Sequence, residues 1–191
     1  NWSNPTPTGR YNLVVIGAGA AGLVSAYIAA TVKAKVTLVE AQKMGGDCLN
    51  YGCVPSKALI RSARVVHSMR NADRYGLEPT TPQFSFRKVM QRVQEVIRAV
   101  EPHDSVERYT RLGVEVLQGH ARIVDPWTVE IALNDGGTRR LTTRSIVIAA
   151  GARPFVPPLP GLDEVGYLTS DTLWDEFAKL DQIPQRLVVL G

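Results

Sequence analysis

The only two cysteines of the chain lie in one glycine-rich segment, Gly45-Gly46-Asp47-Cys48-Leu49-Asn50-Tyr51-Gly52-Cys53-Val54-Pro55-Ser56-Lys57. Because four residues separate Cys48 from Cys53, a short loop can close a disulfide between them. Lys57 follows Cys53 by four residues, so on a helix both side chains face the same way. An ammonium group and a helix N-terminus each favour thiolate over thiol. The segment therefore indicates a redox-active pair; the alternative is two buried, unreactive cysteines.

A nucleotide-binding loop precedes the cysteines, since Gly17-Ala18-Gly19-Ala20-Ala21-Gly22 fits the Gly-x-Gly-x-x-Gly pattern. Gly17 allows the tight turn, Gly19 lets the backbone approach a pyrophosphate, and Gly22 lets helix and strand pack closely. Strands are expected over 13–16 and 35–40, with a helix over 20–33 between them, which makes a parallel β-α-β unit. The alternative is a tight turn without a ligand.

Glu40 ends the second of these strands, 18 residues after Gly22. Its carboxylate can accept hydrogen bonds from the ribose hydroxyls of an adenosine. It would also repel a 2′-phosphate, so FAD or NAD fits this loop better than NADP. The spacing therefore adds an adenosine site to the phosphate-binding loop.

The rest of the chain is expected to complete an α/β fold. Helical periodicity predicts helices over 55–73, 86–100 and 105–112, the last ending at Gly113. Shorter strands over 114–116, 127–133 and 140–149, with a hairpin turn at 134–137, predict an antiparallel β-meander over about 114–145. The predicted fold is a Rossmann-like parallel sheet with helices on both faces plus this small meander.

Composition excludes several classes of protein. The 191 residues are 45% hydrophobic and 21% charged, which is typical of a globular protein, and the net charge of +4 is too diffuse to suggest nucleic-acid binding. No apolar run approaches the ~20 residues of a membrane span. Two cysteines and three scattered histidines do not make a disulfide scaffold or a metal site, so a reducing cytoplasm is expected.

Arg61 and Arg64 continue the face of Lys57 on the predicted helix and are expected to be solvated; phosphate contacts are the alternative.

The two motifs together resemble the FAD domain of the class I pyridine nucleotide-disulfide oxidoreductases, the family of glutathione reductase, dihydrolipoamide dehydrogenase and mercuric reductase. The resemblance covers about residues 11–191, and the cysteine motif is its most specific part. Gly-Asp-Cys-Leu-Asn followed by Pro-Ser-Lys-Ala-Leu-Ile-Arg-Ser-Ala is most similar to the mercuric-reductase-like members.

The resemblance implies a role for each matching position. The loop from Gly17 to Gly22 would lie on the FAD pyrophosphate and Glu40 on its ribose. Cys53 would be the sulfur next to the flavin, Cys48 the thiol that meets the substrate, and Lys57 would lie near flavin N5. The further cofactor-lining residues implied are Ala18, Gly19, Ala20, Ala21, Gly45, Gly46 and Asp47.

Two later segments also match positions of the family. His120 and Ala121 match a segment whose backbone touches adenine, although on its own this stretch reads as a turn with a surface histidine. Ala150 and Gly151 match the Ala-Thr-Gly end of an FAD strand. Because Ala150 replaces the threonine, any hydroxyl contact made there would be absent.

Three parts of the chain are expected. Residues 1–10 are rich in Pro and Thr and read as a linker or chain edge, and residues 11–185 as the first, incomplete segment of an FAD-binding domain. Residues 186–191 repeat the pattern of residues 12–17, an apolar strand that runs into a glycine, and are expected to open an NAD(P)-binding domain. The chain is therefore expected to belong to a longer, homodimeric protein and to be inactive alone.

The resulting hypothesis is an FAD-dependent, NAD(P)H-driven reductase. Electrons would pass from NAD(P)H through FAD to the Cys48–Cys53 disulfide, and from there to a small-molecule disulfide or a soft metal such as mercuric ion. Dihydrolipoamide dehydrogenase-type activity is one alternative. The others are a flavin reductase or oxidase with structural cysteines, and a dinucleotide-binding or redox-sensing module without dithiol catalysis.

Overall fold

The computed structural model describes residues 11–190. The expected linker over residues 1–10 and Gly191 lie outside the described residues. Within the described residues the chain divides into two compact units, residues 11–50 with 100–153 and residues 51–99 with 154–190. Each unit has a hydrophobic core of its own.

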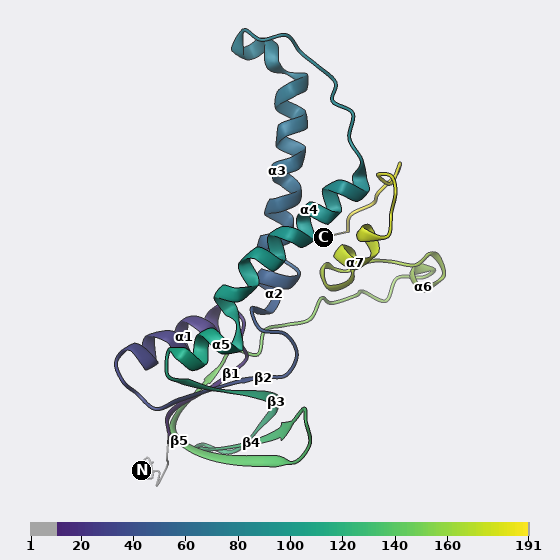
Figure 1. The fold of residues 1–191 in the computed structure, drawn as a ribbon. Helices are drawn as coiled ribbons and strands as arrows, with labels where there is room; N and C mark the ends of the chain where they lie inside the picture. Colours follow the sequence, from purple (N-terminus) through teal and green to yellow (C-terminus); the bar gives the residue numbers. More distant parts are fainter. Residues whose placement is uncertain (1–10, 191) are drawn as a thin grey trace, which may run out of the picture. The chain divides into compact units, whose positions relative to one another are not determined.

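The first unit is built on a mixed sheet (Figure 1). β1 (Tyr11–Ile16) lies between β2 (Val36–Glu40) and β5 (Thr138–Ile148) and is parallel to both. β2 is also parallel to the first part of β3 (Val114–Asp125). β4 (Thr128–Leu133) is antiparallel to β3 and to β5, so the strands close into a ring. The predicted α/β class, with a parallel sheet and an antiparallel meander, is confirmed.

The two faces of the parallel strands are covered differently. On one face, Val15, Leu38 and Val114 pack with the helices α1 (Ala20–Thr31) and α5 (Val106–Arg111). On the other face, Val14, Val39 and Leu117 pack with apolar side chains of β4 and β5. We expected helices on both faces, but in this unit the meander covers the second face. The reason is that Val129 and Ile131, on either side of Glu130, are fully buried and give β4 an apolar side.

β3 and β5 each take part in two kinds of pairing. Residues 114–118 of β3 pair with β2, and the strand continues from Gly119 in antiparallel pairing with β4. The strand expected over 114–116 is therefore 12 residues long, and His120 lies within it rather than in a turn. A Cβ on Gly119 would lie 2.4 Å from the carbonyl oxygen of Ala132, so a glycine permits the close strand contact at the change of partner.

The predicted turns have the backbone that glycine favours. Gly113 follows α5 with a φ of +90°, which confirms it as a helix stop. Gly136 and Gly137 have φ of +102° and +84° in the turn between β4 and β5. The first helix, expected over 20–33, ends at Thr31, because Lys33 takes a φ of +65° that no helix continues.

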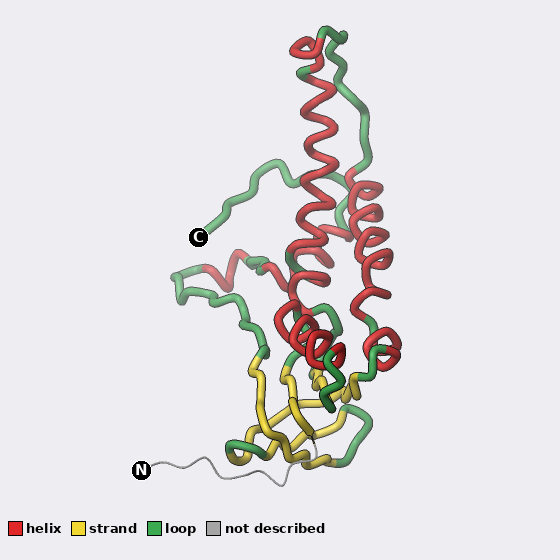
Figure 2. The backbone as a smooth tube through the Cα atoms, turned by 90° about the vertical axis from the view of Figure 1, so that its left-hand side faces the viewer, coloured by secondary structure: helices red, strands yellow, loops and turns green. Residues whose placement is uncertain are grey.

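The second unit is helical (Figure 2). It contains α3 (Cys53–Arg70), the 3-10 helix η1 (Ala72–Tyr75), α4 (Phe86–Val100), α6 (Leu162–Val165) and α7 (Ser170–Ala178). The helices expected over 55–73 and 86–100 are confirmed; α6 and α7 were not predicted. Met90 and Val93 of α4 are fully buried with Trp174 and Phe177 of α7, and the indole of Trp174 donates to the Tyr51 carbonyl at 2.7 Å.

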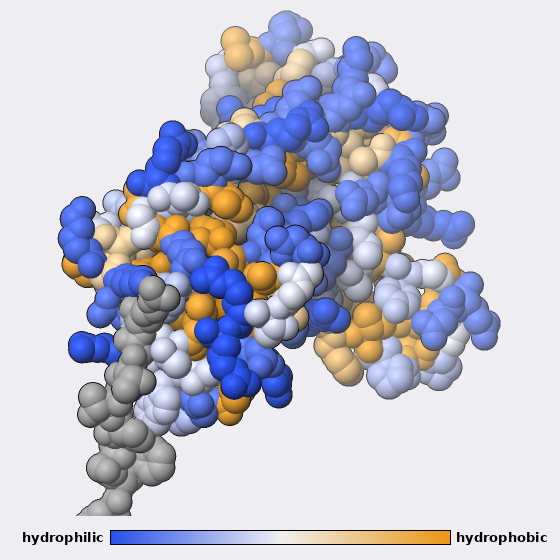
Figure 3. Space-filling view, turned by 60° about the horizontal axis from the view of Figure 1, so that its bottom comes forward, coloured by the Kyte–Doolittle hydropathy of each residue, from blue (hydrophilic) through white to orange (hydrophobic). Residues whose placement is uncertain are grey.

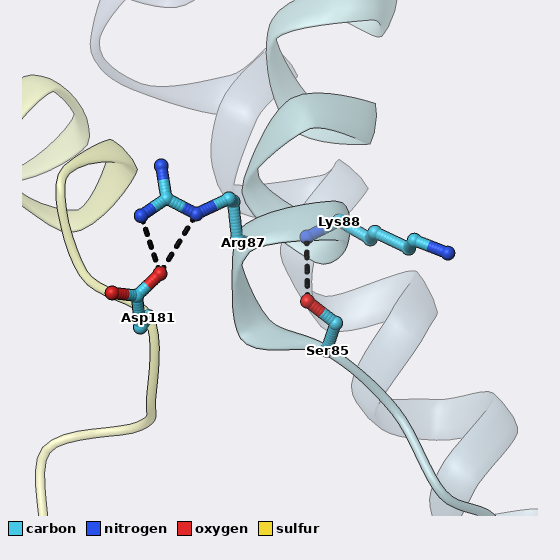
Figure 4. A network of polar contacts seen from close by, with 4 residues as sticks. All are labelled: Ser85, Arg87, Lys88 and Asp181. Carbon is cyan, nitrogen blue, oxygen red and sulfur yellow. Dashed lines mark hydrogen bonds and ion pairs between the residues drawn. The ribbon is translucent and has the colours of Figure 1, made fainter.

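The segment after α7 is joined to the start of α4 by an ion pair. Arg87 donates through both Nε and a terminal nitrogen to one carboxylate oxygen of Asp181, and the Ser85 hydroxyl accepts a hydrogen bond from the Lys88 amide (Figure 4). Residues 186–190 form no strand in this structure, and the expectation that residues 186–191 open an NAD(P)-binding domain stays a prediction. The apolar side chains of residues 186–190 are 63–82% exposed, and none of the strand pairings of the described residues includes this segment.

Candidate functional site

The carboxyl ends of the parallel strands meet at one edge of the first unit. Gly17 follows β1, Glu40 ends β2, and Ala149 follows β5 directly. The parallel part of β3 ends at Gln118, which pairs with Glu40. Ligands of open α/β sheets bind outside this edge, so the fold brings most of the predicted cofactor residues to the expected place.

The nucleotide loop is held tightly to the strand ends. The Gly17 amide donates to the Val39 carbonyl at 2.7 Å, and φ at Gly17 is +102°. A Cβ on Gly17 would lie 2.2 Å from the Ala149 oxygen, and one on Gly22 would lie 1.8 Å from the Gly17 oxygen. Both contacts are with backbone, which has little freedom to yield. Glycine at these two positions is thus required by the packing of the loop itself.

Gly19 differs from these two glycines. It is the N-cap of α1, with φ −79° and ψ −174°, a conformation that any residue can adopt. A Cβ there would come within ordinary contact distance, 3.8 Å, of the Gly46 Cα and nothing closer. No side chain of the described residues caps the start of α1. The first amides of this helix are the groups that bind phosphate in such loops.

Glu40 lies directly beside this loop. One carboxylate oxygen accepts from the Ala18 amide at 2.7 Å and the other accepts from the Gln42 amide at 2.7 Å. A carboxylate has about four lone-pair sites. Each oxygen therefore keeps capacity for a hydroxyl donor while the two backbone bonds fix the direction of the side chain.

The start of the cysteine segment is bonded to the nucleotide loop. The Gly45 amide donates to the Ala18 carbonyl at 2.9 Å. Gly46 lies against Gly19, and a Cβ on Gly46 would be 2.6 Å from the Gly19 Cα. α2 (Gly46–Asn50) begins here and carries exposed Asp47 and partly buried Cys48. The nucleotide loop and residues 45–50 of the cysteine motif are thus parts of one unit.

The two later segments also reach this edge. The Ala149 amide donates to the Ile16 carbonyl at 2.8 Å, and Ala150 and Gly151 follow, the latter with φ +70°. His120 and Ala121 come two and three residues after Gln118, the partner of Glu40. His120 is exposed and Ala121 is half-buried.

Cys53 and Lys57 belong to the second unit. Cys53 is the first residue of α3 and is exposed, and Lys57 lies one turn later, also exposed. The start of α3 two residues earlier than expected therefore places Cys53 at a helix N-terminus. Arg61 and Arg64 are exposed on the same helix, as a solvated face would be. Both cysteines are thiols in this structure, and the disulfide stays a prediction.

Comparison with known proteins identifies the chain. A sequence profile described as pyridine nucleotide-disulphide oxidoreductase matches residues 11–191. The chain belongs to this family. The predicted family is therefore confirmed, and membership of it implies the use of FAD and a pyridine nucleotide.

Individual relatives carry two different names. The chain is 35% identical over 182 residues to a mercuric reductase of Streptomyces lividans, covering 95% of the chain and 38% of the relative. It is 35% identical over 193 residues to a dihydrolipoyl dehydrogenase of Bacillus subtilis (strain 168), covering 95% and 39%. A mercuric reductase of Shigella flexneri is 36% identical over 187 residues, covering 96% and 32%. The chain thus spans less than two fifths of the length of these relatives.

The residues of this family member fit an FAD. Gly17 and Gly22 leave a turn too tight for side chains, Gly19 leaves the start of α1 open to a phosphate, and Glu40 offers acceptors beside it. A separate pocket of about 190 Å³ lies at the other end of β1, lined by Tyr11 and residues 139–142. It is remote from the glycine loops, and its arginines are paired with Glu115 and Glu130.

The part of the chain that the structure describes contains no helix long and apolar enough to span a membrane.

Two contributors to the site were not predicted. Ala149 supports Gly17 through backbone atoms alone, which no residue type signals. Asn50 is the other, since its side-chain amide donates to the Met44 and Gly46 carbonyls. Its place four residues after Gly46 was visible in the sequence, but that spacing is informative only once residues 46–50 are known to be helical.

Proposed function

We propose that this chain is the FAD-binding and dithiol-bearing part of an NAD(P)H-dependent reductase. The observation that carries the proposal is the bond between the two motifs: Gly45 donates to Ala18, and Gly46 packs on Gly19. The turn that leads to Cys48 is therefore fixed to the loop that would hold the cofactor's pyrophosphate. Cys53 and Lys57 are assigned their roles by the motif that they share with the family.

In this proposal each group of the first unit binds a part of FAD. The start of α1 and the backbone at Gly19 bind the pyrophosphate, Glu40 accepts from the ribose hydroxyls, and the backbone at His120 and Ala121 meets adenine. Ala150 and Gly151 line the same edge. FAD, when bound, supplies a two-electron carrier between NAD(P)H and the cysteine pair.

The dithiol then reduces a substrate in two exchange steps. The Cys48 thiolate attacks one sulfur of a substrate disulfide, forms a mixed disulfide and expels the first substrate thiolate. The Cys53 thiolate attacks the Cys48 sulfur, closes the Cys48–Cys53 disulfide and expels the second. Lys57, one turn after Cys53 on α3, keeps the role that the family resemblance gives it, beside the flavin.

The substrate class proposed is a small-molecule disulfide or a soft metal ion. Relatives named mercuric reductase and dihydrolipoyl dehydrogenase match with equal identity, 35%, so this part of the enzyme does not distinguish the two. Thiolates suit both substrates, because they exchange with disulfides and are preferred ligands of soft metals. We also propose a homodimeric full-length enzyme that works in the reducing cytoplasm.

Flavin binding tests the proposal. FAD and FMN are titrated separately into the purified chain, and the quenching of flavin fluorescence gives each Kd. In the proposal, the loop and Glu40 bind the adenosine diphosphate part of FAD, which FMN lacks. FAD is therefore expected to bind at least about tenfold more tightly than FMN. Equal affinities, or binding of neither flavin, would refute the assignment of this loop to FAD.

The cysteine role is tested on the full-length enzyme. It is reduced with NAD(P)H and then treated with an alkylating reagent. We expect the disulfide reductase activity to disappear while flavin reduction by NAD(P)H continues. Activity that survives alkylation would favour a flavin reductase or oxidase with structural cysteines.

A further inference from the structure

The side chain of Asn50 bridges the end of α2 back to the glycine turn before it. Its amide nitrogen donates to the Met44 carbonyl at 3.0 Å and to the Gly46 carbonyl at 2.9 Å. Both partners are acceptors, so the two N–H groups of the carboxamide satisfy them together. Asn50 is partly buried, which limits competition from water for these bonds.

The turn that Asn50 holds is built from residues with great conformational freedom. Gly45 and Gly46 have φ of +85° and +55°. Glycine loses more backbone entropy on ordering than any other residue, so two in succession make a turn that needs support from outside. Leu49 supplies part of it, because its side chain lies where a Cβ on Gly45 would be. Asn50 supplies the polar part.

This turn is also the contact surface for the nucleotide loop. Gly45 donates to Ala18, and the Cα of Gly46 lies on Gly19. Any displacement of the turn therefore reaches the backbone that faces the pyrophosphate. Since Asn50 and Cys48 belong to the same short helix, the bonds of Asn50 also fix the helix that carries the thiol.

We propose that Asn50 is a positioning residue of the cofactor site, which holds the 44–46 turn and α2 against the nucleotide loop without touching the cofactor. The proposal rests on the proposed function, because it takes Gly19 and its neighbours as the FAD site. It predicts that Asn50 controls FAD affinity through the Gly45–Ala18 contact rather than through the stability of the whole fold.

Three variants separate these effects. Asn50→Ala removes both hydrogen bonds. Asn50→Asp keeps the size of the side chain but turns acceptor atoms toward two carbonyls. Asn12→Ala is the matched control, because Asn12 accepts one backbone hydrogen bond from Lys35 at the other end of the strands, away from the turn.

Amide hydrogen exchange and FAD affinity are measured on each variant. For both Asn50 variants we expect the Gly45 amide to exchange at least about tenfold faster, while the Gly17 amide, bonded to Val39, keeps its protection. The Kd for FAD should rise about tenfold or more. Asn12→Ala should leave the Gly45 exchange rate and the Kd unchanged. If Asn50→Ala does not fold, the Gly45 exchange rate and the Kd for FAD of Asn50→Asp test the proposal.

Two results would overturn the proposal. One is an unchanged Gly45 exchange rate in the Asn50 variants. The other is faster exchange with FAD bound as tightly as by the unmodified chain, since Asn50 would then support the turn without positioning the site. A failure of the proposed function looks different: the unmodified chain itself would not bind FAD.

Discussion

The three glycines of the nucleotide loop, Gly17, Gly19 and Gly22, differ in what each residue contributes. Gly17 and Gly22 face backbone atoms of their own unit, so their small size serves the fold. Gly19 faces open space apart from Gly46, and its backbone conformation suits any residue. In the proposed function, its small size serves the ligand. The sequence pattern marks all three alike, and only the structure separates packing from binding.

This difference predicts opposite results for two substitutions. Gly19→Ala should cost less than about 1 kcal/mol of stability but weaken FAD binding at least about tenfold, because the new methyl group occupies the approach to the helix start. Gly22→Ala should destabilise the chain by about 3 kcal/mol, because its Cβ collides with the Gly17 carbonyl. Urea unfolding and FAD titration measure the two effects. Equal FAD affinity of Gly19→Ala and the unmodified chain would contradict the role of Gly19.

Among the secondary-structure elements, four strands are tied together by one carboxylate. Glu115 of β3 accepts hydrogen bonds from Tyr11 of β1, from Thr37 of β2 at 3.3 Å and from Arg139 of β5 at 2.9 Å. Burial alone would raise the pKa of Glu115, but the bonds from Tyr11 and Arg139 outweigh it and hold the pKa below its ordinary value of 4.5. The ionised form is thus the one that stabilises the ring of strands.

The pH dependence of stability follows from this direction. Because the folded state lowers the pKa, the contribution of Glu115 is complete above about pH 4.5 and is lost as the pH falls through the folded pKa. Glu115→Gln should lose about 1 kcal/mol at pH 7, a modest value because the side chain is 38% exposed. Its stability should also fall less steeply below pH 4.5 than that of the unmodified chain.

Urea unfolding between pH 3 and pH 7 measures both effects. Glu95→Gln, which removes an exposed carboxylate on α4, is the control for the change in net charge. Parallel pH profiles for Glu115→Gln and the unmodified chain would show that Glu115 does not link the strands.

Elements with a local signal could be predicted, and elements that depend on distant partners could not. The β-α-β unit, the stop at Gly113 and the turn at 134–137 follow from patterns a few residues long. The second half of β3 exists because β4 pairs with it, and α7 is held by Met90 and Val93 of a distant helix. The apolar run at 187–190 shows the reverse, a strand pattern without a pairing neighbour in the described chain.

For the molecule as a whole, the sequence motif predicted which residues lie together better than it predicted the contacts that hold them there. Glu40 was placed by its distance from the glycine loop, and the structure puts it beside Ala18. The bracing by Asn50 and the backbone contact of Ala149 with Gly17 arise from the folded arrangement of separate segments. The residue types therefore predicted the proposed chemistry, whereas the geometry that would hold them in place depends on the fold.

The central claim, that Cys48 and Cys53 exchange electrons with a bound flavin, is tested most directly by counting electrons. The air-oxidised protein is loaded with FAD and titrated anaerobically with dithionite, beside the Cys53→Ser variant. A disulfide takes up two electrons, so the unmodified protein should consume about two more electrons per FAD than the variant. Equal electron uptake by the two proteins would contradict the account.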